Sequence, residues 1–253
     1  MQAIGLATLV SRPEPVEGLG VSKLYAGIIY TGRSYKRAYL KDIPPKEILS
    51  ECVCSILLLA LGLPTPAPYL VSDPYGYVEP EHGLFFGTED AAHPSLRKLL
   101  EKGHSEVMAR LLEWEHAPAT AVFDEWVANG DRNQGNLLYD GSRGFMLIDH
   151  GRALGAQDDT VPLPEQAFTN HLATCLCTAF SEHGRVALLS ALQRQNDDYQ
   201  SMVNLLSDGD LPRAQTYGMS ERLRQVLSFL AARIPHMPRL VERHGPQGSL
   251  DLR

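Results

Sequence analysis

Two acidic residues and one asparagine, Asp131, Asn136 and Asp149, have the types and spacing that metal-assisted phosphoryl transfer requires. Four residues separate Asp131 from Asn136, and Asp149 follows after an apolar segment, a turn and a second apolar segment. A nucleotide-bound Mg²⁺ takes oxygen ligands, and the attacking hydroxyl needs a carboxylate that can accept or orient its proton. The pattern therefore predicts that Asp131 acts on an acceptor hydroxyl, while Asn136 and Asp149 hold a metal ion against nucleotide phosphates.

A simpler interpretation of the same residues remains open. Asp131 and Asp149 are also typical of turn caps, and Asn136 is typical of a loop amide. The combination of the Asp-x4-Asn spacing, an apolar hairpin of fitting length and the His150-Gly151 pair after Asp149 favours the catalytic interpretation. His150 itself is expected to pack and to form hydrogen bonds rather than to carry a proton.

A cation that could neutralise the nucleotide phosphates is predicted at Lys41. This lysine ends a strand-like segment, and Ala38 and Leu40 lie on the opposite face from it because side chains alternate along a strand. Glu51 follows Glu47 by one helical turn on a stripe that should face inward. A buried carboxylate needs a cation, so Glu51 is expected to pair with Lys41.

A glycine-containing loop could cover the phosphates. The sequence Gly18-Leu-Gly-Val-Ser-Lys23 precedes the strand pair that carries the lysine. Glycines let backbone N–H groups approach a phosphate, and a serine hydroxyl adds a donor. Gly20 and Ser22 are therefore candidate nucleotide-binding residues, although a single Gly-x-Gly is common in ordinary loops.

The elements expected to position these residues change in character near residue 88. Strand-rich segments with one long helix come first, and helical spacing dominates afterwards except for one hairpin turned at Asp140-Gly-Ser142. Prolines 44 and 45 should open the long helix, and Gly62 and Pro64 should end it. The predicted strands cover residues 24–30, 35–41, 69–72 and 83–87, the hairpin residues 137–149, and the other helices residues 96–115, 118–129 and the chain from 164 onward.

This order of elements predicts an α+β fold with two lobes. Residues 1–88 would form a strand-rich N-terminal lobe that grips the nucleotide. Residues 89–253 would form a mainly helical C-terminal lobe into which the catalytic and metal-binding hairpin is inserted. A chain of 253 residues has ample length for a sizeable core in either lobe.

Composition excludes several classes of function. The chain is 44% hydrophobic and 21% charged, with a net charge of −7, so no global basic field favours nucleic acid or an anionic membrane. The longest apolar run, residues 56–63, is far shorter than a membrane span, and the N-terminus lacks a secretory signal. We therefore expect a cytoplasmic protein. Two Cys-x-Cys pairs, at 52/54 and 175/177, are interpreted as buried thiols rather than zinc ligands.

At this point the residues resemble a known family, the HipA-like kinases. The resemblance spans roughly residues 18 to 155 and rests on Gly20-Val-Ser-Lys-Leu-Tyr25, Ala-Tyr-Leu-Lys41, Glu51, Leu61-Gly-Leu-Pro-Thr-Pro66, Asn-Gly-Asp131-Arg-Asn-x2-Asn136 and Leu-Ile-Asp149-His-Gly. It implies a protein-kinase-like fold, ATP as phosphoryl donor and Mg²⁺ as cofactor. Phosphoinositide kinases carry related motifs and are the nearest competing family. Two departures, Asn133 for a frequent His and His150 for the usual Phe, alter the floor of the site without removing a metal ligand.

The sequence thus predicts an ATP- and Mg²⁺-dependent phosphotransferase with an alcohol group as acceptor. A serine or threonine side chain of a protein is the favoured acceptor. A phosphoinositide or another small molecule is the enzymatic alternative, and a catalytically silent kinase-like binding module is the non-enzymatic one. The retention of Lys41, Asp131, Asn136 and Asp149 together argues against the silent module.

Overall fold

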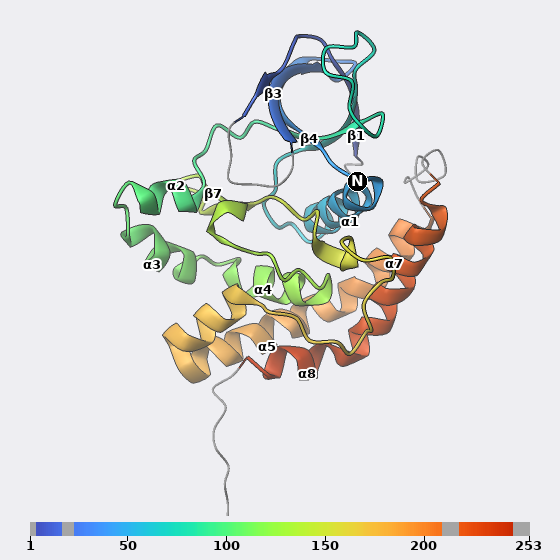
Figure 1. Cartoon of the computed structure of the whole chain (residues 1–253). Helices are drawn as coiled ribbons and strands as arrows, with labels where there is room; N and C mark the ends of the chain where they lie inside the picture. Colours follow the sequence, from blue (N-terminus) through green and yellow to red (C-terminus); the bar gives the residue numbers. More distant parts are fainter. Residues whose placement is uncertain (1–3, 17–22, 209–217, 245–253) are drawn as a thin grey trace, which may run out of the picture.

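A closed β-barrel occupies the N-terminal part of the computed structural model, which describes residues 4–16, 23–208 and 218–244. The strand order is β1-β5-β6-β4-β3-β2, and an additional β1–β3 pairing closes the sheet on itself. Figure 1 views the resulting barrel nearly end-on. The strands are β1 (Gly5–Leu9), β2 (Glu14–Pro15), β3 (Lys23–Tyr30), β4 (Tyr35–Asp42), β5 (Pro68–Ser72) and β6 (Phe85–Glu89).

Strand alternation divides β4 between two environments. Ala38 and Leu40 are fully buried in an apolar cluster with residues of the other barrel strands. Lys41 follows them on the opposite face, and a second cluster that includes Phe86 and Cys52 joins the barrel to helix α1. The strand therefore places its lysine outside the barrel core, towards α1.

Helix α1 (Pro45–Ala60) lies between the barrel and the rest of the chain (Figure 1). Pro45 occupies the first turn, where its missing N–H removes no helical hydrogen bond. Gly62, with φ of 68°, ends the helix in a left-handed conformation that glycine adopts without steric cost. The helix is buried almost all round over residues 49–58, so both neighbouring cores hold it in place.

Helices make up most of the chain after residue 95. They are α2 (Leu96–Glu101), α3 (Glu106–Glu113), α4 (Ala117–Trp126), α5 (His171–Asp208), α7 (Ser220–Arg233) and α8 (Met237–Glu242), with 3₁₀ turns η1 (Gln134–Asn136), η2 (Ala153–Gly155) and η3 (Ile234–His236). The backbone of α5 breaks at Ser181, whose φ is 47°. None of the described helices is both long and apolar enough to cross a membrane.

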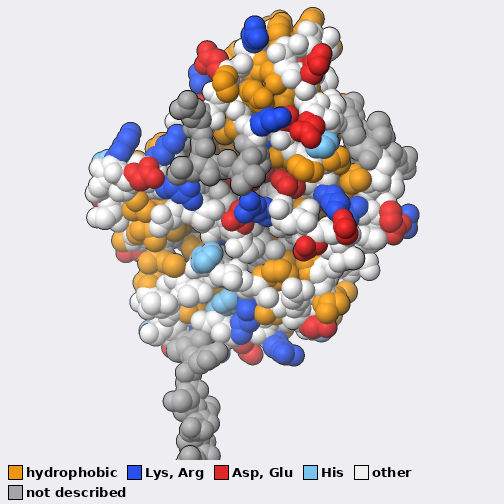
Figure 2. All heavy atoms as spheres, in the orientation of Figure 1, with side chains coloured by type: hydrophobic (Ala, Val, Ile, Leu, Met, Phe, Trp, Pro, Cys, Tyr) orange, Lys and Arg blue, Asp and Glu red, His pale blue; other side chains and the backbone are white. Residues whose placement is uncertain are grey.

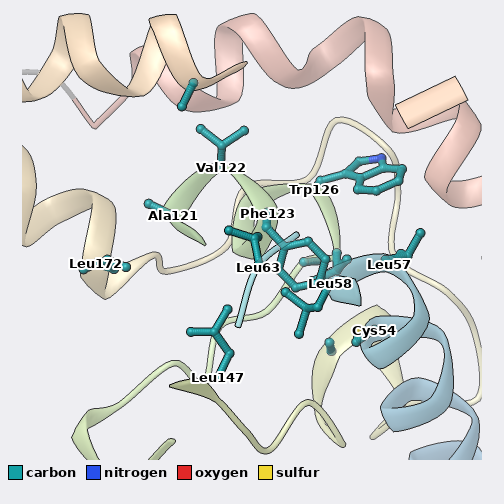
Figure 3. Close-up of a cluster of buried hydrophobic side chains, with 14 of the residues drawn as sticks. Cys54, Leu57, Leu58, Leu63, Ala121, Val122, Phe123, Trp126, Leu147 and Leu172 are labelled. Atoms are coloured by element: carbon teal, nitrogen blue, oxygen red, sulfur yellow. The ribbon is translucent and has the colours of Figure 1, made fainter. Parts of the chain in front are cut away.

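In the largest hydrophobic core, α1, α4, α5 and a short hairpin pack against one another. In Figure 3, Leu58 of α1 lies next to Phe123 of α4, and Leu147 of the hairpin and Leu172 of α5 belong to the same cluster. On another side of α4, the Trp126 ring stacks on Tyr199 with centroids 4.0 Å apart. This core fixes the surfaces from which the candidate site residues project.

The hairpin consists of β7 (Leu137–Tyr139) and β8 (Phe145–Leu147), paired antiparallel with Leu137 opposite Leu147. The connector after α1 holds it, because Leu147 N donates to Pro64 O at 2.8 Å and Thr65 Oγ1 donates to Leu147 O at 2.9 Å. The hairpin is thus attached to the segment that follows the buried helix.

Several element predictions are confirmed and others are wrong. The strand pair, the α1 boundaries and the hairpin agree with the sequence interpretation, whereas β1 and β2 were not predicted. The expected helix 96–115 is two helices, because the chain turns at Gly103 with φ of 90°. The helical region expected from residue 164 begins at His171. Cys175 is exposed rather than buried, because it lies on the outer side of α5, while the other three thiols are buried and free.

Candidate active site

Lys41 lies at the centre of a three-residue ionic contact. Its Nζ donates to Glu51 Oε1 at 2.5 Å and to Asp149 Oδ1 at 2.9 Å. Burial by itself would lower the pKa of Lys41, but the negative charges of Glu51 and Asp149 outweigh it and raise that pKa above its ordinary value. The ammonium group is therefore charged at neutral pH, and it joins β4, α1 and the segment after β8.

Glu51 is almost completely buried, with 2% of its side chain exposed, and uses both carboxylate oxygens. Oε1 accepts from Lys41, and Oε2 accepts from the backbone N–H of His150 at 3.0 Å. Burial would raise the pKa of Glu51, yet the charge of Lys41 and the hydrogen bond from His150 lower it to about 2. Glu51 consequently orients both the lysine and the backbone next to Asp149.

The segment from Asp131 to Asn136 lies between α4 and β7, and hydrogen bonds within the segment hold its shape. The Asp131 carbonyl accepts from Asn136 Nδ2 at 2.8 Å and from Asn133 Nδ2 at 3.0 Å. Asn133 Oδ1 accepts from Gly135 N at 2.8 Å and from Arg97 Nη2 of α2 at 2.8 Å. The Asn133 side chain therefore stabilises the turn that separates Asp131 from Asn136.

Arg132 is a buried cation beneath this loop, with 2% of its side chain exposed. Its Nε and Nη2 donate to the two oxygens of Asp124 at 3.0 and 2.9 Å. Its Nη1 donates to Asn136 O at 3.1 Å and to Ile148 O at 3.0 Å. Arg132 thereby ties the end of the loop to Ile148, the residue between β8 and Asp149.

Asp131 and Asp149 both reach solvent, with 37% and 45% of their side chains exposed. Asp149 has φ of 62°, a left-handed conformation that Asp tolerates better than most residues. Arg152 Nη1 lies 3.9 Å from Asp131 Oδ2, so a cation stands beside the candidate catalytic carboxylate. On the face shown in Figure 2, acidic and basic side chains lie close together at the level between the barrel and the helices.

Comparison with known proteins identifies a family for this chain. A family model described as HipA-like kinase matches residues 35–183, which is more than half of the chain. The chain belongs to the HipA-like kinase family. The resemblance found in the sequence is confirmed, and membership supports kinase activity in general.

A solved structure supports the fold of this HipA-like kinase. The crystal structure of the Helicobacter pylori proinflammatory kinase CtkA is similar with a TM-score of 0.59 and 14% sequence identity, covering 93% of this chain and 96% of that one. At this low sequence identity the similarity supports the mixed helix and strand fold alone and gives no information about a substrate. No curated protein matches the sequence significantly.

The structure brings together most of the residues that the sequence nominated. Lys41, Glu51 and Asp149 are in direct contact, and Asn136 bonds to the backbone of Asp131. The two groups are linked because Ile148 N donates to Asn136 O at 3.2 Å. Two further candidates, Gly20 and Ser22, lie outside the described residues.

Sequence reasoning did not assign contacts to Arg132, Asp124 or Arg152 in this HipA-like kinase. An acid inside the apolar run of α4 and an Arg next to Asp131 were visible signals, since buried charges are normally paired. No spacing rule, however, links Asp124 to Arg132 across the end of a helix. Arg152 gave no signal beyond its place after Gly151.

The donor set around Asp149 fits a hard cation such as Mg²⁺. Asn136 Nδ2 is used as a donor to Asp131, which leaves the amide oxygen as the group that can accept or ligate. No group of three or more His, Cys, Asp or Glu able to hold a metal occurs within residues 4–16, 23–208 and 218–244. A carboxylate and an amide oxygen are donors that suit Mg²⁺, which is usually bound through one or two protein oxygens together with phosphates and water.

Proposed function

We propose that this HipA-like kinase is an ATP- and Mg²⁺-dependent phosphotransferase with a two-lobed, protein-kinase-like layout. Residues 1–88 would form the nucleotide-gripping lobe, and residues 89–253 would form the lobe that carries the catalytic hairpin. The observation that carries the proposal is the contact of Lys41 Nζ with both Glu51 and Asp149. The contact supports the proposal because it holds a buried cation and its partner carboxylate beside the exposed carboxylate of Asp149, and phosphoryl transfer needs both a cation and oxygen ligands near the phosphates.

Each residue then has a defined task. Lys41 binds the α- and β-phosphates, and Glu51 holds its ammonium group. Asn136 and Asp149 would hold Mg²⁺, which would supply positive charge to neutralise the nucleotide phosphates. Gly20 and Ser22 are proposed to cover the phosphates.

Asp131 is proposed to orient the acceptor hydroxyl and to take its proton. The acceptor oxygen forms a bond to the γ-phosphorus while the bond from that phosphorus to the β,γ-bridging oxygen breaks, so that ADP leaves. Arg152 Nη1 lies 3.9 Å from Asp131 Oδ2, so a cation stands beside the carboxylate that would receive the proton. The favoured acceptor is a serine or threonine of a protein.

The test is formation of ADP and phosphorylated product from ATP, with and without Mg²⁺. The protein is incubated with ATP and a cell lysate, and modified residues are located by mass spectrometry. Asp131→Ala should lower turnover by about 10²- to 10⁴-fold. Asp197→Ala, an exposed acid on α5, is the matched control and should leave turnover unchanged.

The outcomes separate the competing functions. Phosphoserine or phosphothreonine that depends on Asp131 supports the proposal. Asp131-dependent ADP formation with only small-molecule products would move the acceptor to the alternative class. Absence of Mg²⁺-dependent turnover in the wild-type protein would instead leave a silent binding module.

A further inference from the structure

His150 is buried between the two halves of the candidate site. Only 1% of its side chain is exposed, and its ring contacts the edge of Phe123 with centroids 6.1 Å apart. Its backbone N–H donates to Glu51 Oε2, and its ring Nδ1 lies 3.8 Å from the same oxygen. On its other side, ring Nε2 lies 2.8 Å from Arg132 Nη2.

The contact with Arg132 determines which ring nitrogen carries the proton. An arginine guanidinium has only donors and keeps its charge in proteins, so Nε2 must accept the hydrogen bond. The neutral ring then has its proton on Nδ1, on the side of Glu51 Oε2. One imidazole thus accepts from the arginine of the catalytic loop and turns its N–H towards the carboxylate that holds Lys41.

Every N–H group of the Arg132 guanidinium has an acceptor, and His150 is one of them. Nε and one hydrogen of Nη2 go to Asp124, and the hydrogens of Nη1 go to the carbonyls of Asn136 and Ile148. The remaining hydrogen on Nη2 is directed at His150 Nε2. A phenyl ring at position 150 would fill similar space but would leave this buried N–H without an acceptor.

We infer that His150 is a positioning residue that joins the nucleotide grip to the catalytic loop. Through it, Glu51 and its partner Lys41 are connected to Arg132, and Arg132 holds Asn136 and Ile148 on either side of the hairpin opening. Through this link, the placement of the loop that carries Asp131 depends on the same buried residues that hold Lys41. The inference deepens the proposed function and rests on it for its kinetic consequence.

The kinetic test compares His150→Phe with His150→Gln. The Gln amide oxygen can occupy the place of Nε2 and accept from Arg132, whereas Phe keeps the ring shape without an acceptor. Mg²⁺-dependent ADP formation is measured against ATP concentration, well below the lowest melting temperature of the set, and normalised to the fraction of protein that binds ATP. His150→Phe should lower kcat by about 10- to 100-fold, as removal of an orienting hydrogen bond does in other sites.

The different effects expected on kcat and on the KM for ATP distinguish a positioning role from a loss of folded protein. The KM for ATP should change little in His150→Phe, because Lys41 and Glu51 remain in contact, and His150→Gln should recover most of the lost kcat. A wild-type kcat in His150→Phe would overturn the inference. An equal loss in both variants would also overturn it, because the acceptor atom would then be irrelevant.

A spectroscopic measurement decides the inference without turnover. Nitrogen-15 spectra of the imidazole, assigned with His150→Gln, should report a neutral ring with the proton on Nδ1 and a bare Nε2. A proton on Nε2 would overturn the inference, because Arg132 could not then donate to it. If the wild-type protein forms no ADP, the proposed function fails, and this measurement still decides the role of His150.

Discussion

Lys41 and Glu51 form an ion pair in which Nζ and Oε1 are 2.5 Å apart and only 18% and 2% of the side chains are exposed. The pair joins a barrel strand to the helix that packs beneath the barrel. Desolvation of two charges is costly, so such a pair need not stabilise the fold much more than apolar residues would. Removal of one partner is different, because the other charge then stays buried without compensation.

Lys41→Met should therefore destabilise the protein as well as abolish the nucleotide grip. We expect a loss of about 3–5 kcal/mol in the free energy of unfolding, because Glu51 is left without its cation. Urea unfolding measures this loss. The matched control is Lys36→Met in the same strand, whose pair with Glu89 is 39% and 34% exposed, so that its loss should be much smaller. Equal losses in the two variants would contradict the special role of the Lys41 pair.

Glu51 should make stability depend on pH in the acid range. Its pKa is lowered to about 2 in the folded protein and lies at its ordinary value of 4.5 in the unfolded chain. As the pH falls, Glu51 is protonated at a lower pH in the folded protein than in the unfolded chain. Its contribution to the free energy of unfolding is therefore complete above pH 4.5 and is lost as the pH falls towards 2. Between pH 6 and pH 3 the wild-type protein should lose about 2 kcal/mol that Glu51→Gln does not lose. Parallel pH curves for the two proteins would contradict this prediction.

Asp149→Asn should remove the Mg²⁺-dependent part of nucleotide binding. Asn tolerates the left-handed backbone at this position, so the loop should keep its conformation while one proposed metal ligand and its charge are lost. Thermal shift with ATP is measured in the presence and absence of Mg²⁺. The wild-type shift should correspond to about 2–3 kcal/mol at ATP concentrations near 100 times Kd, and the variant should show little of its Mg²⁺-dependent part. Asp159→Asn, a 99% exposed acid further along the segment, should keep the full shift.

The hairpin should tolerate a methyl group at one glycine of its turn and not at another. Gly144 has φ of 93°, and a Cβ added there would overlap the indole ring of Trp114. Gly141 has φ of 69° with no atom within 4 Å of an added Cβ. Gly141→Ala should cost about 1–2 kcal/mol from backbone strain alone, and Gly144→Ala about 1–3 kcal/mol more from the overlap. Equilibrium unfolding measures both, and a smaller loss for Gly144→Ala would contradict the close packing of this turn on Trp114.

Part of the site followed from local rules. Strand alternation predicted that Lys41 would face away from Ala38 and Leu40, and helical spacing predicted an inward Glu51, so their contact could be expected from the sequence. The apolar hairpin between Asn136 and Asp149 was predicted in the same way. These features depend on neighbours within a few residues, where the geometry of the chain itself restricts the positions of side chains.

Other features of the fold could not be predicted from local sequence patterns, because tertiary packing decides where an element begins and ends. Helical spacing runs from residue 96 to 115 without a clear break, yet Gly103 turns the chain between α2 and α3. The short strand β1 carries too few residues for a distinct pattern, and it becomes a strand by pairing with β3 and β5. A periodic pattern identifies the buried face of an element but does not show where tertiary packing ends that element.

The sequence by itself identified the family and predicted the strand that carries Lys41, the helix that carries Glu51 and the hairpin between Asn136 and Asp149, because residue types and short spacings encode them. Tertiary structure alone decided that Lys41 contacts Asp149 and that Arg132 and His150 connect the loop to Glu51. Those contacts join residues as far as 108 positions apart. They arise because a closed barrel, a buried helix and a shared core bring the segments together, and no local spacing records that packing.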